Sequence, residues 1–197
     1  MNFDSEISGI ENGNSVSVEA VLREGSTTDK ALYVEKDAGS SGNVIISAGT
    51  GVQNANELTF EFDFNLAEAN SGTVAQIFFD KALYGSPMDV VIVADSAGYR
   101  FGALSGWSAG NRGYFGTETL SFGKYYHVKL HVVVGDADSF VATLYIDGTE
   151  VGSTNIFLNP EKAADYQPAG KVNSVVFGWQ EAASLKAYID NLSLSVK

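Results

Sequence analysis

The amino-acid sequence predicts an all-β fold, an antiparallel two-sheet β-sandwich of the jelly-roll type. Apolar and polar residues alternate with period two along most of the chain, and the spacing typical of helices is almost absent. Gly, Asn and Asp residues separate these runs and favour tight turns between them. About a dozen short strands joined by such turns, with no long helix, are typical of two packed antiparallel sheets.

The clearest alternation in the first half of the chain is ELTFEFDFN at 57–65. Its apolar residues share one parity and its charged or polar residues share the other, so one face is expected to be buried and the other wet. The apolar set is Leu58, Phe60, Phe62 and Phe64. The other strands predicted in this half are 15–22, 30–36, 43–47, 73–80, 88–95 and 98–104.

The strongest hairpin signal is Asp147-Gly148 in the second half, because both positions of a two-residue turn favour a positive φ. The strands predicted in this half are 125–134, 140–147, 149–154, 173–179 and 187–196. Only NPEKAADY at 159–166 looks helical, with Asn159 able to cap a helix and Pro160 suited to its first position. One short helical turn is expected there.

The last predicted strand changes phase near Asp190. Its apolar residues before and after this point lie on opposite parities, which a β-bulge would explain. The two sets are Leu185, Ala187 and Ile189, then Leu192, Leu194 and Val196. A bulge redirects side chains, so Asp190 could point at a bound Ca²⁺, with Asp4 or Glu6 and backbone carbonyls as further oxygen ligands. The alternative is a carboxylate at a strand end in solvent.

The length of the chain limits the number of domains, and its charge limits the kinds of partner that it can bind. The 197 residues fit one domain, 1–197, and Met1 followed directly by NFDSE looks like a domain excised from a larger secreted protein. Other domains of that parent protein are therefore expected partners. The 24 acidic and 12 basic residues give a net charge of −12, which repels nucleic acid, anionic lipid and acidic glycans.

Other functions are excluded by what the sequence lacks. It contains no cysteine, which removes disulfides, thiolate metal sites and thiol nucleophiles. No apolar stretch approaches the length of a membrane span, and the N-terminus does not resemble a signal peptide. Membrane insertion is therefore not expected.

Residues 119–153 carry a pattern that resembles a known superfamily. An aromatic, His and Val segment is followed by a strand, a turn and a strand that ends in an aromatic residue, an aliphatic residue, Asp and Gly. The matching residues are Tyr125, Tyr126, His127 and Val128, then Leu144, Tyr145, Ile146, Asp147 and Gly148. In this pattern residues 57–197 resemble the concanavalin A-like superfamily, particularly bacterial laminin-G-like domains and carbohydrate-binding modules.

The closing AYIDNLSLS at 187–195 is similar to the last strand of many bacterial glycan-binding sandwiches. In those proteins the Asp of this strand often joins an N-terminal acid at a structural Ca²⁺, so the resemblance supports the calcium site at Asp190. Because the superfamily includes lectins, adhesion modules, glycosidases and lyases, the resemblance implies the fold more than the ligand.

A glycoside hydrolase of this superfamily would place a Glu, an Asp and a second Glu on one concave strand. Glu61 and Asp63 fit the first two positions, but Leu66 occupies the third. The pair of carboxyl groups needed for acid and base work is therefore missing, and Glu61 and Asp63 are interpreted as a solvated strand face.

A polysaccharide lyase would need a Tyr or His base beside cations that stabilise an enolate, and YYH at 125–127 with Lys129 and His131 superficially offers them. Lyases act on uronic polymers, however, which the net negative charge opposes. His127, Lys129 and His131 share one parity and are therefore interpreted as a half-exposed strand face.

The stretch GALSGWSAGNRGYFGTE at 102–118 sets large rings among residues that cannot bury them. Its glycines let the backbone bend freely, so that the rings can stand at the rim of the sandwich. A sugar site needs a flat ring to stack on and planar hydrogen-bonding groups beside it. The predicted residues are Trp107, Asn111, Arg112, Tyr114 and Phe115. A satellite core, with Trp107 folded under its own loop, is the alternative.

Two further rings are weaker candidates for sugar contact. Tyr84 lies in the predicted loop DKALYGSPMD. Trp179 shares a parity with Val175 and Phe177, which indicates the core, although its place at a strand end keeps it a candidate.

These observations lead to the expectation of a non-catalytic carbohydrate-binding module in a secreted or surface-attached bacterial protein. It would bind a neutral polysaccharide or oligosaccharide, such as a plant α- or β-glucan, without chemical change. The alternatives are a laminin-G-like adhesion module, which would need an exposed apolar patch, and a glycoside hydrolase or polysaccharide lyase of the same fold.

Overall fold

The computed structural model describes residues 10–12, 17–39, 42–52, 57–78, 89–104, 112–134, 140–155, 172–180 and 183–196. The described strands of the first half are β1 (Ile10–Asn12), β2 (Ser17–Leu22), β3 (Lys30–Lys36), β4 (Gly42–Val52), β5 (Glu57–Ala69), β6 (Gly72–Phe78) and β7 (Asp89–Asp95). Those that follow are β8 (Gly98–Leu104), β9 (Arg112–Tyr114), β10 (Tyr126–Val134), β11 (Phe140–Ile146), β12 (Thr149–Asn155), β13 (Val172–Trp179) and β14 (Leu185–Val196).

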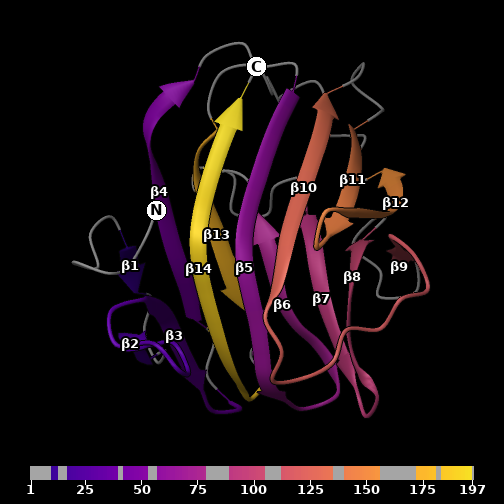
Figure 1. Cartoon of the computed structure of the whole chain (residues 1–197). Coiled ribbons are helices and arrows are strands. Elements are labelled where there is room, and N and C mark those ends of the chain that lie inside the picture. Colours follow the sequence, from indigo (N-terminus) through magenta and orange to yellow (C-terminus); the bar gives the residue numbers. More distant parts are fainter. Residues whose placement is uncertain are drawn as a thin grey trace.

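The strands form two sheets that pack face to face (Figure 1). The front sheet has the order β12-β11-β10-β5-β14-β3-β2, and the back sheet has the order β1-β4-β13-β6-β7-β8-β9. Neighbouring strands pair in antiparallel fashion in both sheets, for example β10 with β5 and β14 with β5. The predicted all-β, antiparallel two-sheet sandwich is therefore confirmed.

The predicted strands coincide with observed ones to within a few residues. The alternating 57–65 run lies in β5, which extends to Ala69. The three-residue strands β1 and β9 were not predicted, because three residues are too few for a period to be recognised. The predicted helical turn at 159–166 lies outside the described residues. Within the described residues, no helix is long and apolar enough to cross a membrane.

Aromatic side chains of β5 form the centre of the core between the sheets. Phe60, Phe62 and Phe64 are each at most 1% exposed, as alternation predicts. The ring of Phe62 lies 5.5 Å from that of Phe177 in β13, and the ring of Phe64 lies 5.8 Å from that of Tyr99 in β8. Burial of such large apolar surfaces is the main force that holds the two sheets together.

Two local features agree with the sequence. Asp147 and Gly148 have φ values of 49° and 80°, as expected for the hairpin turn between β11 and β12. The register of β14 on β5 shifts between Asp190 and Ser193, and Asn191 has a φ of 50°. The predicted β-bulge is therefore present, and it divides β14 into two halves of opposite phase.

Candidate active site

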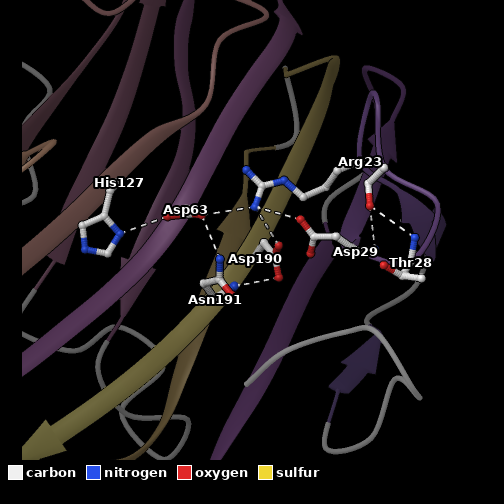
Figure 2. Close-up of polar contacts among 8 residues, drawn as sticks. Arg23, Thr28, Asp29, Asp63, His127, Asp190 and Asn191 are labelled. Carbon is white, nitrogen blue, oxygen red and sulfur yellow. Dashed lines mark hydrogen bonds and ion pairs between the residues drawn. The ribbon is translucent and has the colours of Figure 1, made fainter.

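The outer face of the front sheet carries a row of polar and ionisable side chains across β5 and β10. On β5 the residues that alternate with the core phenylalanines point outward, and Asp63 is one of them. Asp63 is opposite His127 of β10 in the register of the two strands. The His127 Nδ1 atom lies 2.9 Å from Asp63 Oδ1, a hydrogen bond that Figure 2 shows. The sheet therefore builds a carboxylate–imidazole pair from residues far apart in sequence.

The second oxygen of Asp63 is also occupied. Arg23, which follows β2, places its Nη1 atom 3.3 Å from Asp63 Oδ2. The Asn191 side-chain amide donates to the same oxygen at 2.9 Å. Because both carboxylate oxygens have partners, Asp63 is held in one orientation, and its side chain is only 17% exposed. The prediction of a solvated strand face therefore does not describe Asp63.

Arg23 lies at the centre of an acidic cluster (Figure 2). Its Nη1 atom is 3.1 Å from Asp190 Oδ2 and 3.5 Å from Asp29 Oδ2, in addition to its contact with Asp63. The Asp190 side chain is fully buried, and this burial raises the pKa of its carboxyl group. The Asn191 backbone amide, which donates to Asp190 Oδ1 at 2.7 Å, and the Arg23 guanidinium both oppose this rise. The guanidinium thus compensates a buried carboxylate and orients an outer one.

The bulge in β14 explains how this cluster is assembled. At the bulge, Asp190 is opposite Asp63 and lies on the same outer face, buried where it pairs with Arg23, and Asn191, at positive φ, also extends its amide along that face to Asp63. In an uninterrupted strand, adjacent residues would point to opposite faces. The bulge thereby lets two consecutive side chains serve one network.

A second group of side chains lies further along β10. Lys129 is on the same face as His127 and pairs in register with Glu61 of β5 and Tyr145 of β11. Its Nζ atom lies 4.3 Å from the centre of the Tyr145 ring. His131 Nε2 is 3.6 Å from Glu57 Oε2, and the His131 side chain is 33% exposed. The side chains of 127, 129 and 131 lie on one partly exposed face of β10, as their shared parity predicts.

The structure separates the residues predicted to bind sugar. Tyr84, Trp107 and Asn111 lie outside the described residues, as does the side chain of Arg112, whose backbone begins β9. Tyr114 of β9 is half-buried, with the Arg100 guanidinium 4.4 Å from its ring centre.

The rings of Phe115 and Trp179 are both 3% exposed and belong to the core between the sheets. Trp179 stacks on Phe177 at 6.0 Å, as its parity indicated. Neither ring is therefore available as a surface platform for a sugar, because a neighbouring sheet covers it.

The calcium site stays a prediction. Asp4 and Glu6 lie outside the described residues, and Asp190 is already paired with the cationic Arg23. Among the described side chains, no group of three or more His, Asp or Glu residues is arranged to hold a metal ion. Thermal melting with and without a chelator tests this site, because a bound ion stabilises the folded state.

No protein-family model and no curated protein matches the sequence. Solved structures do share its fold. A conserved carbohydrate esterase from the Shiga toxin-encoding bacteriophage phi24B is similar, with a TM-score of 0.67 and 18% identity over 96% of this chain and 90% of that chain. An endo-β-1,4-glucuronan lyase from the fungus Trichoderma reesei has a TM-score of 0.60 and 14% identity over 100% and 94% of the two chains. A variant of the alginate lyase Aly36B, in complex with alginate tetrasaccharide, has a TM-score of 0.54 and 17% identity over 90% and 83%.

These comparisons correct the expectation of a non-catalytic binding module that is not an enzyme. Solved structures that share this architecture over most of their length include a carbohydrate esterase and polysaccharide lyases. The sequence-based interpretation considered groups within one strand or one loop, whereas His127, Asp63, Arg23 and Asn191 come from four separate segments. The resemblance to β-sandwich proteins that act on carbohydrates is confirmed, and the narrower one to laminin-G-like domains stays a prediction.

Sequence reasoning named His127, Lys129 and Asp63 but missed Arg23 and the role of Asn191. The polar parity of ELTFEFDFN identified Asp63 as outward-facing, and the predicted phase change near Asp190 marked the segment that contains Asn191. No local signal identified Arg23, because its place beside Asp63 depends on how β2 pairs at the edge of the front sheet.

Proposed function

We propose that the protein is a polysaccharide lyase that cleaves a uronate-containing polymer by β-elimination on the outer face of the front sheet. The observation that carries this proposal is the hydrogen bond of 2.9 Å between His127 and Asp63, with the imidazole 46% exposed and Lys129 on the same face. The similarity in fold to glucuronan and alginate lyases supports it.

His127 is the general base of this proposal. A carboxylate can only accept, so the bond to Asp63 places the imidazole proton on Nδ1 and leaves the Nε2 lone pair available. Nε2 takes the proton from C5 of the uronate. The C5–H electrons then form the C4=C5 double bond as the C4–O4 bond breaks and O4 leaves. Orientation of an imidazole by a fixed carboxylate is a recurrent way to prepare such a base.

Lys129 and Tyr145 supply the other two functions that the elimination needs. The C5 proton becomes acidic enough only when the adjacent carboxylate is neutralised, and Lys129 is two residues from His127, about 7 Å along the strand. Within the described residues, Lys129 makes no ion pair, so its charge is available to a ligand. The hydroxyl of Tyr145, whose ring lies under Lys129, is the proposed proton donor to O4.

The net charge of −12 was the reason to expect no acidic substrate, and it is a weaker argument than the local arrangement. Charges separated by more than about 8 Å in physiological salt are largely screened from each other. Lys129, which makes no ion pair among the described residues, is therefore the cation that a bound uronate would experience most directly, whereas the charge of Arg23 is already compensated by Asp29, Asp63 and Asp190. A polymeric substrate is also consistent with the predicted secreted or surface location, which stays a prediction.

The proposal is tested by incubating the protein with alginate, glucuronan, a neutral β-glucan and an acetylated glycan. Elimination produces a conjugated unsaturated uronate, which is followed by its ultraviolet absorbance. His127→Gln should lower the rate by about 10²–10⁴-fold, the usual contribution of a general base. The matched control is His131→Gln, on the same strand and face, which should retain the wild-type rate.

Other outcomes of this panel would overturn the proposal. Retention of a polysaccharide without any product would leave a binding protein, and cleavage of the neutral glucan would indicate a hydrolase. Release of acetate would indicate an esterase, for which His127 and Asp63 would be two members of a triad. Among the described residues, no serine hydroxyl bonds to His127, so elimination fits the site better.

A further inference from the structure

Three tyrosines form a row on the outer face of the front sheet, beside the proposed reaction site. The rings of Tyr33 in β3 and Tyr188 in β14 lie 5.0 Å apart, and the two residues pair in register. The ring of Tyr125, just before β10, lies 6.2 Å from that of Tyr188. All three side chains are only partly buried, so their rings are accessible in part. Burial raises the pKa of both Tyr33 and Tyr125 to about 12, and these phenols are therefore neutral at pH 7.

Asn65 lies in the middle of this row with an unused hydrogen-bond acceptor. It is opposite Tyr188 in the register of β5 and β14. Its neighbours Phe64 and Leu66 point into the core, so Asn65 belongs to the outer face, as Asp63 does. The residue is only 7% exposed, and its Oδ1 atom has no hydrogen-bond partner among the described residues. An acceptor left unpaired at such a depth is unfavourable unless a ligand or water satisfies it.

The row is continuous with the reaction site at one end. The Arg23 guanidinium lies 4.2 Å above the Tyr125 ring and 3.3 Å from Asp63, the partner of His127. At the other end, the ends of β3, β5 and β14 border an open hollow of about 490 Å³, lined by residues that include Glu35, Glu68 and Lys186. The Tyr33 hydroxyl donates to Glu35 Oε2 at 3.0 Å. The volume of the hollow is in the range of ligand sites in proteins.

We infer that the row of Tyr33, Tyr188 and Tyr125 around Asn65 is a substrate subsite for pyranose residues next to the bond that is cleaved. This inference rests on the proposed function. Sugar rings present apolar C–H faces that pack on aromatic rings, and their hydroxyls donate to acceptors such as Asn65 Oδ1. The polymer would thus run across the strands from the His127 site towards the hollow.

The inference predicts a dependence on the length of the substrate. The probes are alginate and glucuronan oligosaccharides from dimer to hexamer, tested with the full chain. Tyr188→Ala should raise KM for the longer oligosaccharides by about tenfold to a hundredfold, because one stacked ring is lost. The KM for the shortest should change little, and kcat should be retained. Tyr188→Phe keeps the ring and should behave as the wild type, which separates a lost platform from a misfolded chain.

Tyr114→Ala is the matched control. Tyr114 is also half-buried and lies under an arginine, Arg100, at 4.4 Å, but it belongs to the back sheet. Its substitution should leave KM unchanged at every length. If Tyr188→Ala likewise leaves KM unchanged at every length, the subsite is wrong even though the enzyme is a lyase.

Binding of the same oligosaccharides, measured by calorimetry without turnover, separates this inference from the proposed function. Binding that Tyr188→Ala weakens, with no unsaturated product, would overturn the lyase and keep the subsite. Equal binding by the wild type and by Tyr188→Ala would overturn the subsite. Absence of binding by the wild type to either series would also overturn it.

Discussion

His127 and His131 lie on the same strand and the same face, on either side of Lys129, yet their surroundings differ. His127 Nδ1 is 2.9 Å from the carboxylate of Asp63, whose other oxygen is held by Arg23 and Asn191. His131 Nε2 is 3.6 Å from Glu57, whose side chain is 41% exposed. Residue type, parity and a nearby acid are therefore shared, whereas the distance to the acid is shorter at His127, and Asp63 is oriented by Arg23 and Asn191 on its other oxygen.

This comparison indicates where catalytic competence would come from in such a sheet. An exposed ion pair contributes little, because solvent competes with it and both side chains are mobile. A carboxylate that is held on both oxygens orients the imidazole without further loss of side-chain entropy. In the proposed mechanism the ring at 127 is thus prepared for proton transfer, whereas the ring at 131 lies 3.6 Å from a more exposed acid.

Replacement of the oriented acid should have the largest effect. In Asp63→Asn, the carboxamide oxygen must face the donors Arg23 and Asn191, so its NH₂ group faces His127 and forces the imidazole proton onto Nε2. Elimination should slow by about 10²–10⁴-fold, while the fold is kept. Glu57→Gln, on β5 beside His131, is the control and should keep the wild-type rate. Equal rates for the two variants would show that orientation by Asp63 is not needed.

Loss of the cation that compensates the buried acid should have the next largest effect, on stability. Arg23→Met leaves Asp190 buried without its partner, which costs about 3–5 kcal/mol in the free energy of unfolding. The control Arg100→Met removes an arginine that also stacks on a tyrosine, but its partner Asp95 is 48% exposed. That loss should be below about 1 kcal/mol. Urea unfolding of both variants measures the difference.

The stability that Arg23→Met loses relative to the wild type should become smaller as the pH falls. The pKa of Asp190 is raised above its ordinary value by burial, and loss of the guanidinium raises it further. A carboxyl group with a raised pKa in the folded state favours folding below its unfolded pKa, and this gain is lost as pH rises through the folded pKa. The difference in the free energy of unfolding between Arg23→Met and the wild type should therefore become smaller as the pH is lowered from neutral towards the ordinary pKa of Asp. A gap independent of pH would mean that Asp190 is not the group left unpaired.

A smaller effect is expected at the bulge. Asn191 has a φ of 50°, which glycine adopts without strain and alanine does not. Asn191→Ala should be less stable than Asn191→Gly by about 1 kcal/mol. Both variants lose the hydrogen bond to Asp63 and should slow elimination by about threefold to tenfold. If only the alanine variant is slow, the bulge matters for its backbone and not for its amide.

Much of the fold was predictable because alternation depends on local sequence alone. The parity of Phe60, Phe62 and Phe64 determined which side of β5 is core, and the phase slip located the bulge at Asp190. These patterns arise from the pleat of a strand, which does not depend on the rest of the chain.

The site was less predictable because it depends on which strands become neighbours. Asp63 and His127 are separated by 64 positions, and Arg23 and Asp190 by 167, so no local spacing joins them. The same limitation misdirected the interpretation of the aromatic residues. Phe115 lies in a Gly-rich stretch that predicted a surface platform, yet it is buried in the core, whereas Tyr33 and Tyr188 meet on the outer face through strand pairing.

The smallest expected effect is on the salt dependence of kcat/KM, which compares the influence of the net charge of the molecule with that of the charges at the site. With a net charge of −12, the protein should repel a polyuronate at long range, and salt should weaken this repulsion. The value of kcat/KM on a long polyuronate should therefore rise a few-fold as ionic strength increases from about 0.01 to 0.15 M, over which the Debye length falls from about 30 to 8 Å. A short oligosaccharide, with fewer charges, should show a weaker rise. If kcat/KM falls with salt instead, Lys129 controls the encounter with the substrate as well as the chemistry, and the net charge of the molecule does not determine substrate choice.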